Sequence, residues 1–163
     1  MLDFYKLWDY VISDPELRKS HIHGPDHWAR VERNGLFIGK QVGADLTVIK
    51  LFALFHDSKR QNDSIDPGHG KRGAEYSKTL RNELFKISDQ QFDCFYNACR
   101  LHTRQIHTKD ITMGVCWDSD RLDLRRIGFK PSAKFMNTDI AKKIVINNDW
   151  QKLEEVSLRK HKP

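Results

Sequence analysis

Cysteine is scarce in this sequence, and long apolar runs are missing. Its three cysteines, Cys94, Cys99 and Cys116, form no CxxC pair, which argues against a disulfide framework and against a cysteine zinc site. We expect all three to be reduced and buried. No apolar run reaches the length of about eighteen residues that a membrane span needs, and charged residues interrupt the apolar segment 1–14. We therefore expect no secretory signal, no membrane partner and a cytoplasmic location.

Several nucleotide-binding and catalytic motifs are also missing. The chain contains no GxxxxGK[ST], GxGxxG or GxSxG motif, which argues against a P-loop NTPase, a Rossmann dehydrogenase and an α/β-hydrolase. There is no internal repeat, low-complexity segment or linker. A chain of 163 residues is long enough to bury a sizeable core, so we expect one domain over residues 1–163, with a C-terminal helical extension over about 131–158.

Basic residues are in excess, and the formal net charge is +6. This charge favours anionic partners, which include small phosphorylated substrates and nucleic acid. The sign alone does not choose between them. The basic run 159–162 at the end of the chain is more typical of a solvated terminus than of a nucleic-acid-binding arm, so a small phosphorylated substrate is the favoured partner.

Apolar residues recur with helical spacing along the chain. Between Pro25 and Val42, apolar or small residues follow one another at steps of three and four, as on one face of a helix. Residues 46–57 are almost continuously apolar, and their length and their Ala and Leu content favour a helix over a buried strand. No alternating strand pattern competes, so the sequence predicts an all-α bundle. Further helices are expected at about 3–12, 71–86, 89–104, 111–124 and 138–158, with a loop over 62–70.

Four of these helices direct one ionisable side chain toward the core. These side chains belong to His27, His56, His102 and Asp120, each of which continues an apolar stripe. A single histidine on such a stripe is usually a hydrogen-bonded core residue. Four together, with Asp57 directly after His56, predict a shared metal centre, because a buried carboxylate is costly unless a cation compensates its charge.

Three segments carry a family resemblance. His27-Trp-Ala-Arg30-Val31, then His56-Asp57, then Trp117-Asp-Ser-Asp120-Arg-Leu-Asp123 resemble, in order, the signature segments of the histidine-aspartate (HD) metal-dependent phosphohydrolase superfamily. The match spans about His21 to Gly128. It implies a helical bundle of the HD type.

The resemblance also implies a set of metal ligands. In the family the first His, the His-Asp pair and a later Asp bind one metal, which corresponds here to His27, His56, Asp57 and Asp120. Asp118 and Asp123 compete with Asp120 for the last place. Asp120 precedes an Arg-Leu dipeptide as in similar proteins, so we expect Asp123 to cap a helix or brace a neighbouring group and Asp118 to lie behind the ligands.

Two further histidines bear on the number of metals. Some members of the superfamily are binuclear, with intervening histidines and the Asp of the pair holding a second metal. His69 and His102 resemble those histidines, but His69 comes early, on the expected loop. The alternative for both is phosphate contact or acid–base work. The expected catalytic residues are Asp57, His69 and His102.

The predicted centre suits phosphoester hydrolysis. A divalent metal, with Mn, Fe, Co, Ni, Zn or Mg as candidates, acidifies a bound water, and nearby cations stabilise charge on the phosphate. Other histidines, such as His21 and His23 at the expected pocket rim, have no assigned role. The candidates for phosphate binding are Arg30, Lys59, Arg60 and Arg121, although any one of them could be an ordinary exposed cation.

Two functional classes remain open beside a less favoured third. The first is a metal-dependent phosphohydrolase, a phosphomonoesterase or phosphodiesterase acting on a nucleotide or another small phosphorylated metabolite. The second is a noncatalytic sensor or nucleic-acid-binding module that keeps the metal as a structural element. The third is a diiron oxygenase, because a few proteins of similar fold use two irons.

Overall fold

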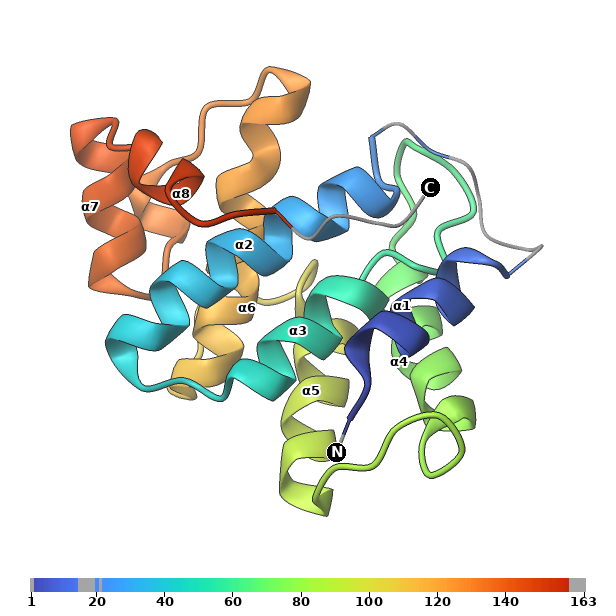
Figure 1. Cartoon of the computed structure of the whole chain (residues 1–163). Coiled ribbons are helices and arrows are strands. Elements are labelled where there is room, and N and C mark those ends of the chain that lie inside the picture. Colours follow the sequence, from blue (N-terminus) through green and yellow to red (C-terminus); the bar gives the residue numbers. More distant parts are fainter. Residues whose placement is uncertain (1, 15–19, 21, 159–163) are drawn as a thin grey trace.

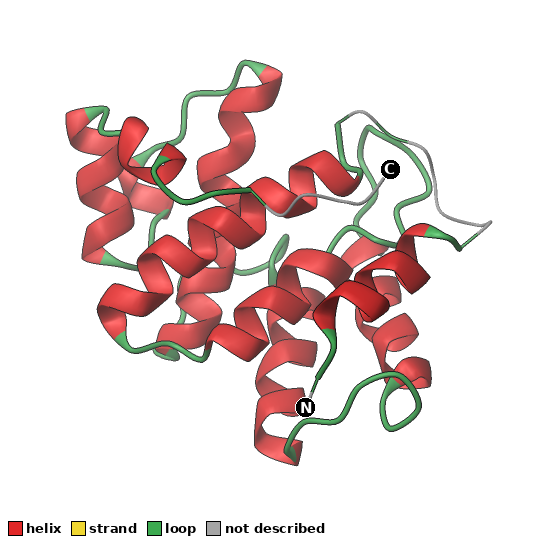
Figure 2. Ribbon diagram, in the orientation of Figure 1, coloured by secondary structure: helices red, strands yellow, loops and turns green. Residues whose placement is uncertain are grey.

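The computed structural model of the protein describes residues 2–14, 20 and 22–158; His21 and the basic run 159–162 lie outside them. Within the described part the chain forms α-helices and short 3₁₀ helices and no β-strand (Figure 2), so the predicted all-α fold is confirmed. The α-helices are α1 (Phe4–Ile12), α2 (Pro25–Val42), α3 (Leu46–Phe55), α4 (His69–Leu80), α5 (Asp89–Leu101), α6 (Ile111–Leu122), α7 (Asp139–Asn147) and α8 (Gln151–Glu154), and the 3₁₀ helices are η1 (Asp123–Ile127) and η2 (Ala133–Phe135).

Polar side chains in the sequence define where most helices begin. Each accepts hydrogen bonds from backbone N–H groups of the first turn, which have no partner inside the helix. One such cap contributes about 1 kcal/mol to stability. In α2, Pro25 occupies the first turn instead, where its missing N–H costs nothing. The capping side chains are those of Asp3, Asp45, Ser88, Asp110 and Thr138.

Two predicted helices have different boundaries in the structure. The helix expected over 71–86 ends at Leu80, because Arg81 is extended and Asn82 after it adopts a left-handed conformation with a φ of 72°. The helix expected over 138–158 is divided into α7 and α8 by Asn148, whose φ is 58°. Asparagine tolerates this conformation better than most residues, and the break it causes was not visible in the apolar spacing.

Helix α3 forms the centre of the bundle. It contacts α2, α4, α5 and α6 (Figure 1), and its side chains from Val48 to Phe55 are buried except for Lys50. Large buried side chains of the neighbouring helices, such as Trp28, Phe95 and Trp117, surround it. Because every side of α3 is covered, His56 and Asp57 at its end are held inside the protein.

The C-terminal segment packs onto the same bundle. Helix α7 contacts α6, and α8 contacts α2 (Figure 1). No helix within residues 2–14, 20 and 22–158 combines the length and the apolar character needed to cross a lipid bilayer.

The cysteines differ in one respect from expectation. All three are free thiols, and Cys99 and Cys116 are buried as predicted, but Cys94 is partly exposed. Burial and the nearby carboxylate of Asp110 raise the pKa of Cys94 to about 12. Its thiolate form, the nucleophilic one, is therefore scarce at neutral pH.

Candidate metal centre

The ends of α2, α3 and α6 bring the four predicted ligands together. His27 Nε2 lies 3.1 Å from His56 Nε2 and 3.3 Å from Asp120 Oδ1. Asp57 Oδ2 lies 3.7 Å from His27 Nε2 and 3.9 Å from His56 Nε2. Both histidines are fully buried, whereas the Asp120 side chain is 21% exposed. We call these four residues the first cluster.

The hydrogen bonds behind the two histidines show which ring nitrogens face inward without a proton. His56 Nδ1 lies 3.1 Å from the carbonyl oxygens of Phe52 and Ala53, and His27 Nδ1 lies 2.7 Å from Asp123 Oδ2. These oxygens can only accept, so each Nδ1 carries a hydrogen and each neutral ring presents a lone pair at Nε2. Two lone pairs and two carboxylates then face one another, an arrangement that a divalent cation satisfies.

The pKa shifts in the first cluster agree with such a donor set. Burial lowers the pKa of His56 to about 3, so its ring is neutral at pH 7. Burial alone would raise the pKa values of Asp57 and Asp120, but the surrounding histidines lower both below the ordinary value. Burial also works against the charge on His27, but its contacts with Asp120 and Asp123 raise its pKa overall. His27 is therefore the ligand for which a proton competes with a metal.

Metal affinity of the first cluster should fall as the pH is lowered from 8 to 5. A proton on His27 Nε2 blocks the metal, and because the pKa of His27 is raised above 6.5, the loss begins at a higher pH than for an unperturbed imidazole. His56, with a pKa near 3, adds nothing to the loss until far lower pH. Titration against a chromophoric chelator from pH 8 to pH 5 measures the effect. A flat affinity across that range would contradict it, and His107→Gln, at an exposed loop residue, is the control.

A second cluster lies on the other side of Asp57. Asp57 Oδ1 lies 3.0 Å from His69 Nε2 and 3.9 Å from His102 Nε2, and the two Nε2 atoms are 2.9 Å apart. His102 Nδ1 lies 2.7 Å from the carbonyl oxygen of Cys99, and His69 Nδ1 contacts that of Asp66. Both rings therefore also direct an unprotonated Nε2 inward when neutral. The single carboxylate of Asp57 stands between two sets of histidines, one oxygen toward each.

His69 is the first residue of α4 and not part of the expected loop 62–70. Two glycines allow α4 to approach closely enough to place it there. A Cβ at Gly73 would lie 2.1 Å from the carbonyl oxygen of Phe55, and one at Gly70 would lie 2.3 Å from that of Cys99. Both distances are far shorter than van der Waals contact. Gly70 and Gly73 therefore let α4 pack closely against the ends of α3 and α5, with His69 at the start of α4.

Gly73→Ala should destabilise the fold and loosen the second cluster. The added methyl group must push α4 away from Phe55, and overpacking of this kind costs about 1–3 kcal/mol. Urea unfolding measures the loss, and elemental analysis shows whether metal content falls with it. Thr79→Ala, at an exposed position of the same helix, should stay within about 0.5 kcal/mol of the wild type. An unchanged unfolding midpoint for Gly73→Ala would contradict the close approach.

Sequence reasoning did not assign a role to His23, which the structure places against Asp57. His23 Nδ1 lies 2.8 Å from Asp57 Oδ2, and its side chain is 13% exposed. Trp28 Nε1 donates to its backbone carbonyl oxygen at 2.7 Å. His23, His27 and Asp57 also lie close enough together to share a cation. Because His23 precedes α2, no apolar periodicity could have identified it.

The other two aspartates of the third segment lie outside the first cluster. Asp123 contacts His27 through Oδ2 and accepts a hydrogen bond from Arg30 Nε at 2.8 Å through Oδ1, which is the bracing position expected for it. Asp118 is buried and accepts hydrogen bonds from the backbone N–H groups of Asn137 and Thr138, both at 2.7 Å. It therefore fastens the start of α7 to α6 and does not lie behind the ligands as expected.

The predicted phosphate-binding cations lie in different places. Arg60 is beside the second cluster, with Nη1 3.1 Å from His69 Nδ1 and 3.6 Å from Asp57 Oδ1. Arg30 is 27% exposed and its Nε is held by Asp123. Lys59 instead pairs with Asp14 at 2.6 Å and lies over the ring of Tyr76.

The Arg121 guanidinium is held by backbone carbonyl oxygens. It donates to the carbonyl oxygens of Gln105, Ile106 and Phe135 at 2.6–2.7 Å. Lys59 and Arg121 therefore both have partners within the protein away from the ligand side chains, and phosphate binding by either stays a prediction. Successive residues of a helix point about 100° apart, so a neighbour of a ligand need not share its direction.

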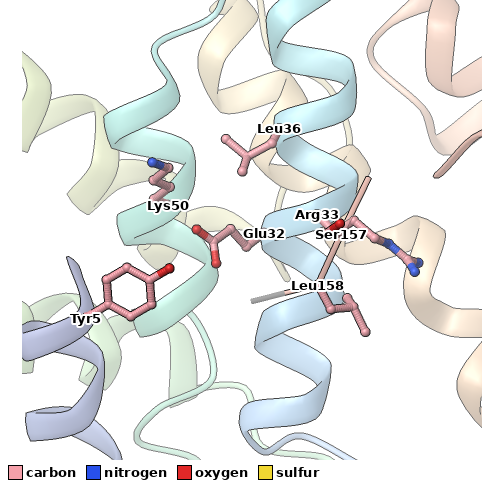
Figure 3. Close-up of a pocket in the computed structure, with 7 residues that line it drawn as sticks. All are labelled: Tyr5, Glu32, Arg33, Leu36, Lys50, Ser157 and Leu158. Atoms are coloured by element: carbon pink, nitrogen blue, oxygen red, sulfur yellow. The ribbon is translucent and has the colours of Figure 1, made fainter. Parts of the chain in front are cut away.

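A cavity of about 440 Å³ lies between α1, α2, α3 and the C-terminal segment (Figure 3). It contains no residue of either cluster. Both signs of charge are present, from Glu32 of α2 and Lys50 of α3 (Figure 3). Its place in the fold separates it from the histidines and aspartates described above.

Comparison with known proteins agrees with this architecture. No protein-family model and no curated protein matches the sequence. The structure is similar to the crystal structure of a predicted HD superfamily hydrolase from an uncultured Thermotogales bacterium, with a TM-score of 0.68 and 22% sequence identity. The similarity covers 93% of this chain and 86% of that one. The chain therefore shares the all-α fold of that predicted HD superfamily hydrolase, which confirms the fold that the three sequence segments implied.

Proposed function

We propose that the protein is a metal-dependent phosphohydrolase that cleaves a phosphoester of a nucleotide or another small phosphorylated metabolite. The observation that carries the proposal is the placement of Asp57 between two sets of buried histidines with inward-facing Nε2 atoms. The fold shared with a predicted HD superfamily hydrolase supports a hydrolytic activity.

The donor atoms indicate which metals fit. His27, His56, Asp57 and Asp120 would hold one divalent cation, and Asp57, His69 and His102 would hold a second. This mixture of imidazole and carboxylate suits Mn, Fe, Co, Ni or Zn better than Mg, which prefers oxygen ligands. When bound, the metal supplies Lewis acidity and a water with a lowered pKa.

The chain's own residues supply orientation and charge. Asp123 and the Phe52 carbonyl oxygen hold the rings of His27 and His56 so that Nε2 faces inward. Arg60 places positive charge beside Asp57 and His69, where it would stabilise the nonbridging oxygens of a phosphate. The partial exposure of Asp120 and Arg30 gives a substrate access from that side.

A metal and substrate screen tests the proposal. Metal-stripped protein is loaded in turn with Mn, Fe(II), Co, Ni, Zn and Mg and assayed against phosphomonoesters, phosphodiesters and nucleotides. We expect at least one metal to support phosphoester cleavage and the stripped protein to be inactive. A protein that binds these metals and cleaves nothing in the panel would contradict the proposal.

The net charge of +6 is the observation that favours the second candidate, a noncatalytic nucleic-acid-binding or sensor module. Steeply salt-dependent binding to DNA or RNA, unaffected by loss of the metal, would support it. Several basic side chains, such as Lys59 and Arg121, are engaged in contacts within the protein, which weakens this candidate. The diiron oxygenase is tested by measuring the iron content of the purified protein.

A further inference from the structure

A second cavity, of about 640 Å³, lies beside the second cluster and is basic. We propose that it binds a second phosphate group, so that the substrates are compounds carrying two phosphates. This rests on the proposed phosphohydrolase function. The volume is within the range of small-molecule sites. Four basic side chains and one carboxylate line the cavity, those of Lys59, Arg60, Lys71, Arg72 and Glu75.

Arg60 connects this cavity to the candidate metal centre. Its guanidinium lies 3.6 Å from Asp57 Oδ1 and 3.1 Å from His69 Nδ1, and the same side chain lines the cavity. A phosphate held at the candidate metal centre would therefore lie about one arginine side chain away from the basic cavity. Arg60 is thus the side chain that the two regions share.

The cations of the cavity are held in position by contacts within the protein. Lys59 Nζ pairs with Asp14, whereas Arg72 pairs with Asp66 and donates Nε to the carbonyl oxygen of Lys59 at 3.0 Å. A guanidinium has five N–H donors, so these contacts leave others of Arg72 for a ligand. Gly68 leaves room for this group, because a Cβ there would lie 2.6 Å from Arg72 Nη1.

Lys71 completes the basic surface. It is exposed and adjacent to Arg72 in α4, so its ammonium group can follow a bound anion. Arginine donates in parallel to two oxygens of one phosphate, and lysine adds a mobile point charge. A phosphate offers several acceptor oxygens to these donors, which makes it the ligand chemistry that the cavity fits best.

The test compares adenosine compounds that differ in their phosphates. The metal-loaded wild type is assayed with AMP, ADP and adenosine 3′,5′-bisphosphate, and we expect kcat/KM to be higher for at least one of the two-phosphate compounds than for AMP. Lys71→Glu should lower that preference by about tenfold, as expected for loss of a charged hydrogen bond and introduction of a repelling charge. Lys78→Glu, with the same charge change at an exposed position of α4 outside the cavity, should keep it.

A wild type without the preference, or a Lys71→Glu variant that keeps it, would overturn the second-phosphate site while leaving phosphohydrolase activity in place. If the wild type cleaves none of the three compounds, the proposed function fails on this panel, and calorimetric binding of inorganic pyrophosphate tests the site by itself. Lys71→Glu should then weaken pyrophosphate binding by about tenfold relative to Lys78→Glu. Equal affinities of the two variants would overturn the site.

Discussion

Asp57→Asn should abolish phosphoester hydrolysis and metal retention together. The carboxylate of Asp57 faces His27 and His56 with Oδ2 and His69 with Oδ1, so its charge serves both clusters. The amide of asparagine has nearly the same shape but no charge, and its NH₂ group would face a metal with hydrogens. We expect activity to fall by about a thousandfold or more, because the metal contributes several kcal/mol to transition-state stabilisation.

Three measurements check this result. Elemental analysis gives the metal content, a phosphoester assay gives the rate, and thermal unfolding with and without added metal gives the stabilisation by binding. Asp26→Asn, an exposed carboxylate directly before His27, is the matched control and should behave as the wild type. Full activity of Asp57→Asn with undiminished metal content would contradict the assignment of Asp57 as a shared ligand.

His102→Gln should remove one of two bound metals. His102 and His69 belong to the second cluster only, so the first cluster keeps its four donor side chains in the variant. We expect two metal equivalents in the wild type and one in the variant, with activity reduced by about a hundredfold or more because one of the two proposed cations would be missing. Titration of metal-stripped protein, followed by elemental analysis after gel filtration, measures the stoichiometry.

The same experiment decides between the two roles open for His69 and His102. One metal in both proteins, with activity lost only in the variant, would contradict the second metal and indicate acid–base work by His102. Thr103→Ala, at the exposed neighbouring residue, controls for disturbance at the end of α5. Its metal content and activity should equal those of the wild type.

Much of the fold could be predicted because local chemistry determines it. Apolar residues spaced for one helix face, and capping side chains such as Asp45 and Ser88, act within a few residues of where they stand. The breaks at Asn82 and Asn148 escaped prediction because a left-handed residue leaves the apolar spacing around it unchanged. The stripes that carry His27, His56 and Asp120 were readable for the same local reason, since a side chain on a buried stripe points inward.

The contacts between segments far apart in the sequence were decided only by the tertiary structure. His23 reaches Asp57 across 34 positions, and Arg121 reaches the carbonyl oxygens of Gln105 and Ile106. The close approach of α4 at Gly70 and Gly73 places His69 beside His102. The sequence by itself determined the helices and the inward direction of the first-cluster side chains, because these depend on near neighbours. Packing of whole helices decided which groups meet at Asp57, because that depends on the approach of backbones far apart in the chain.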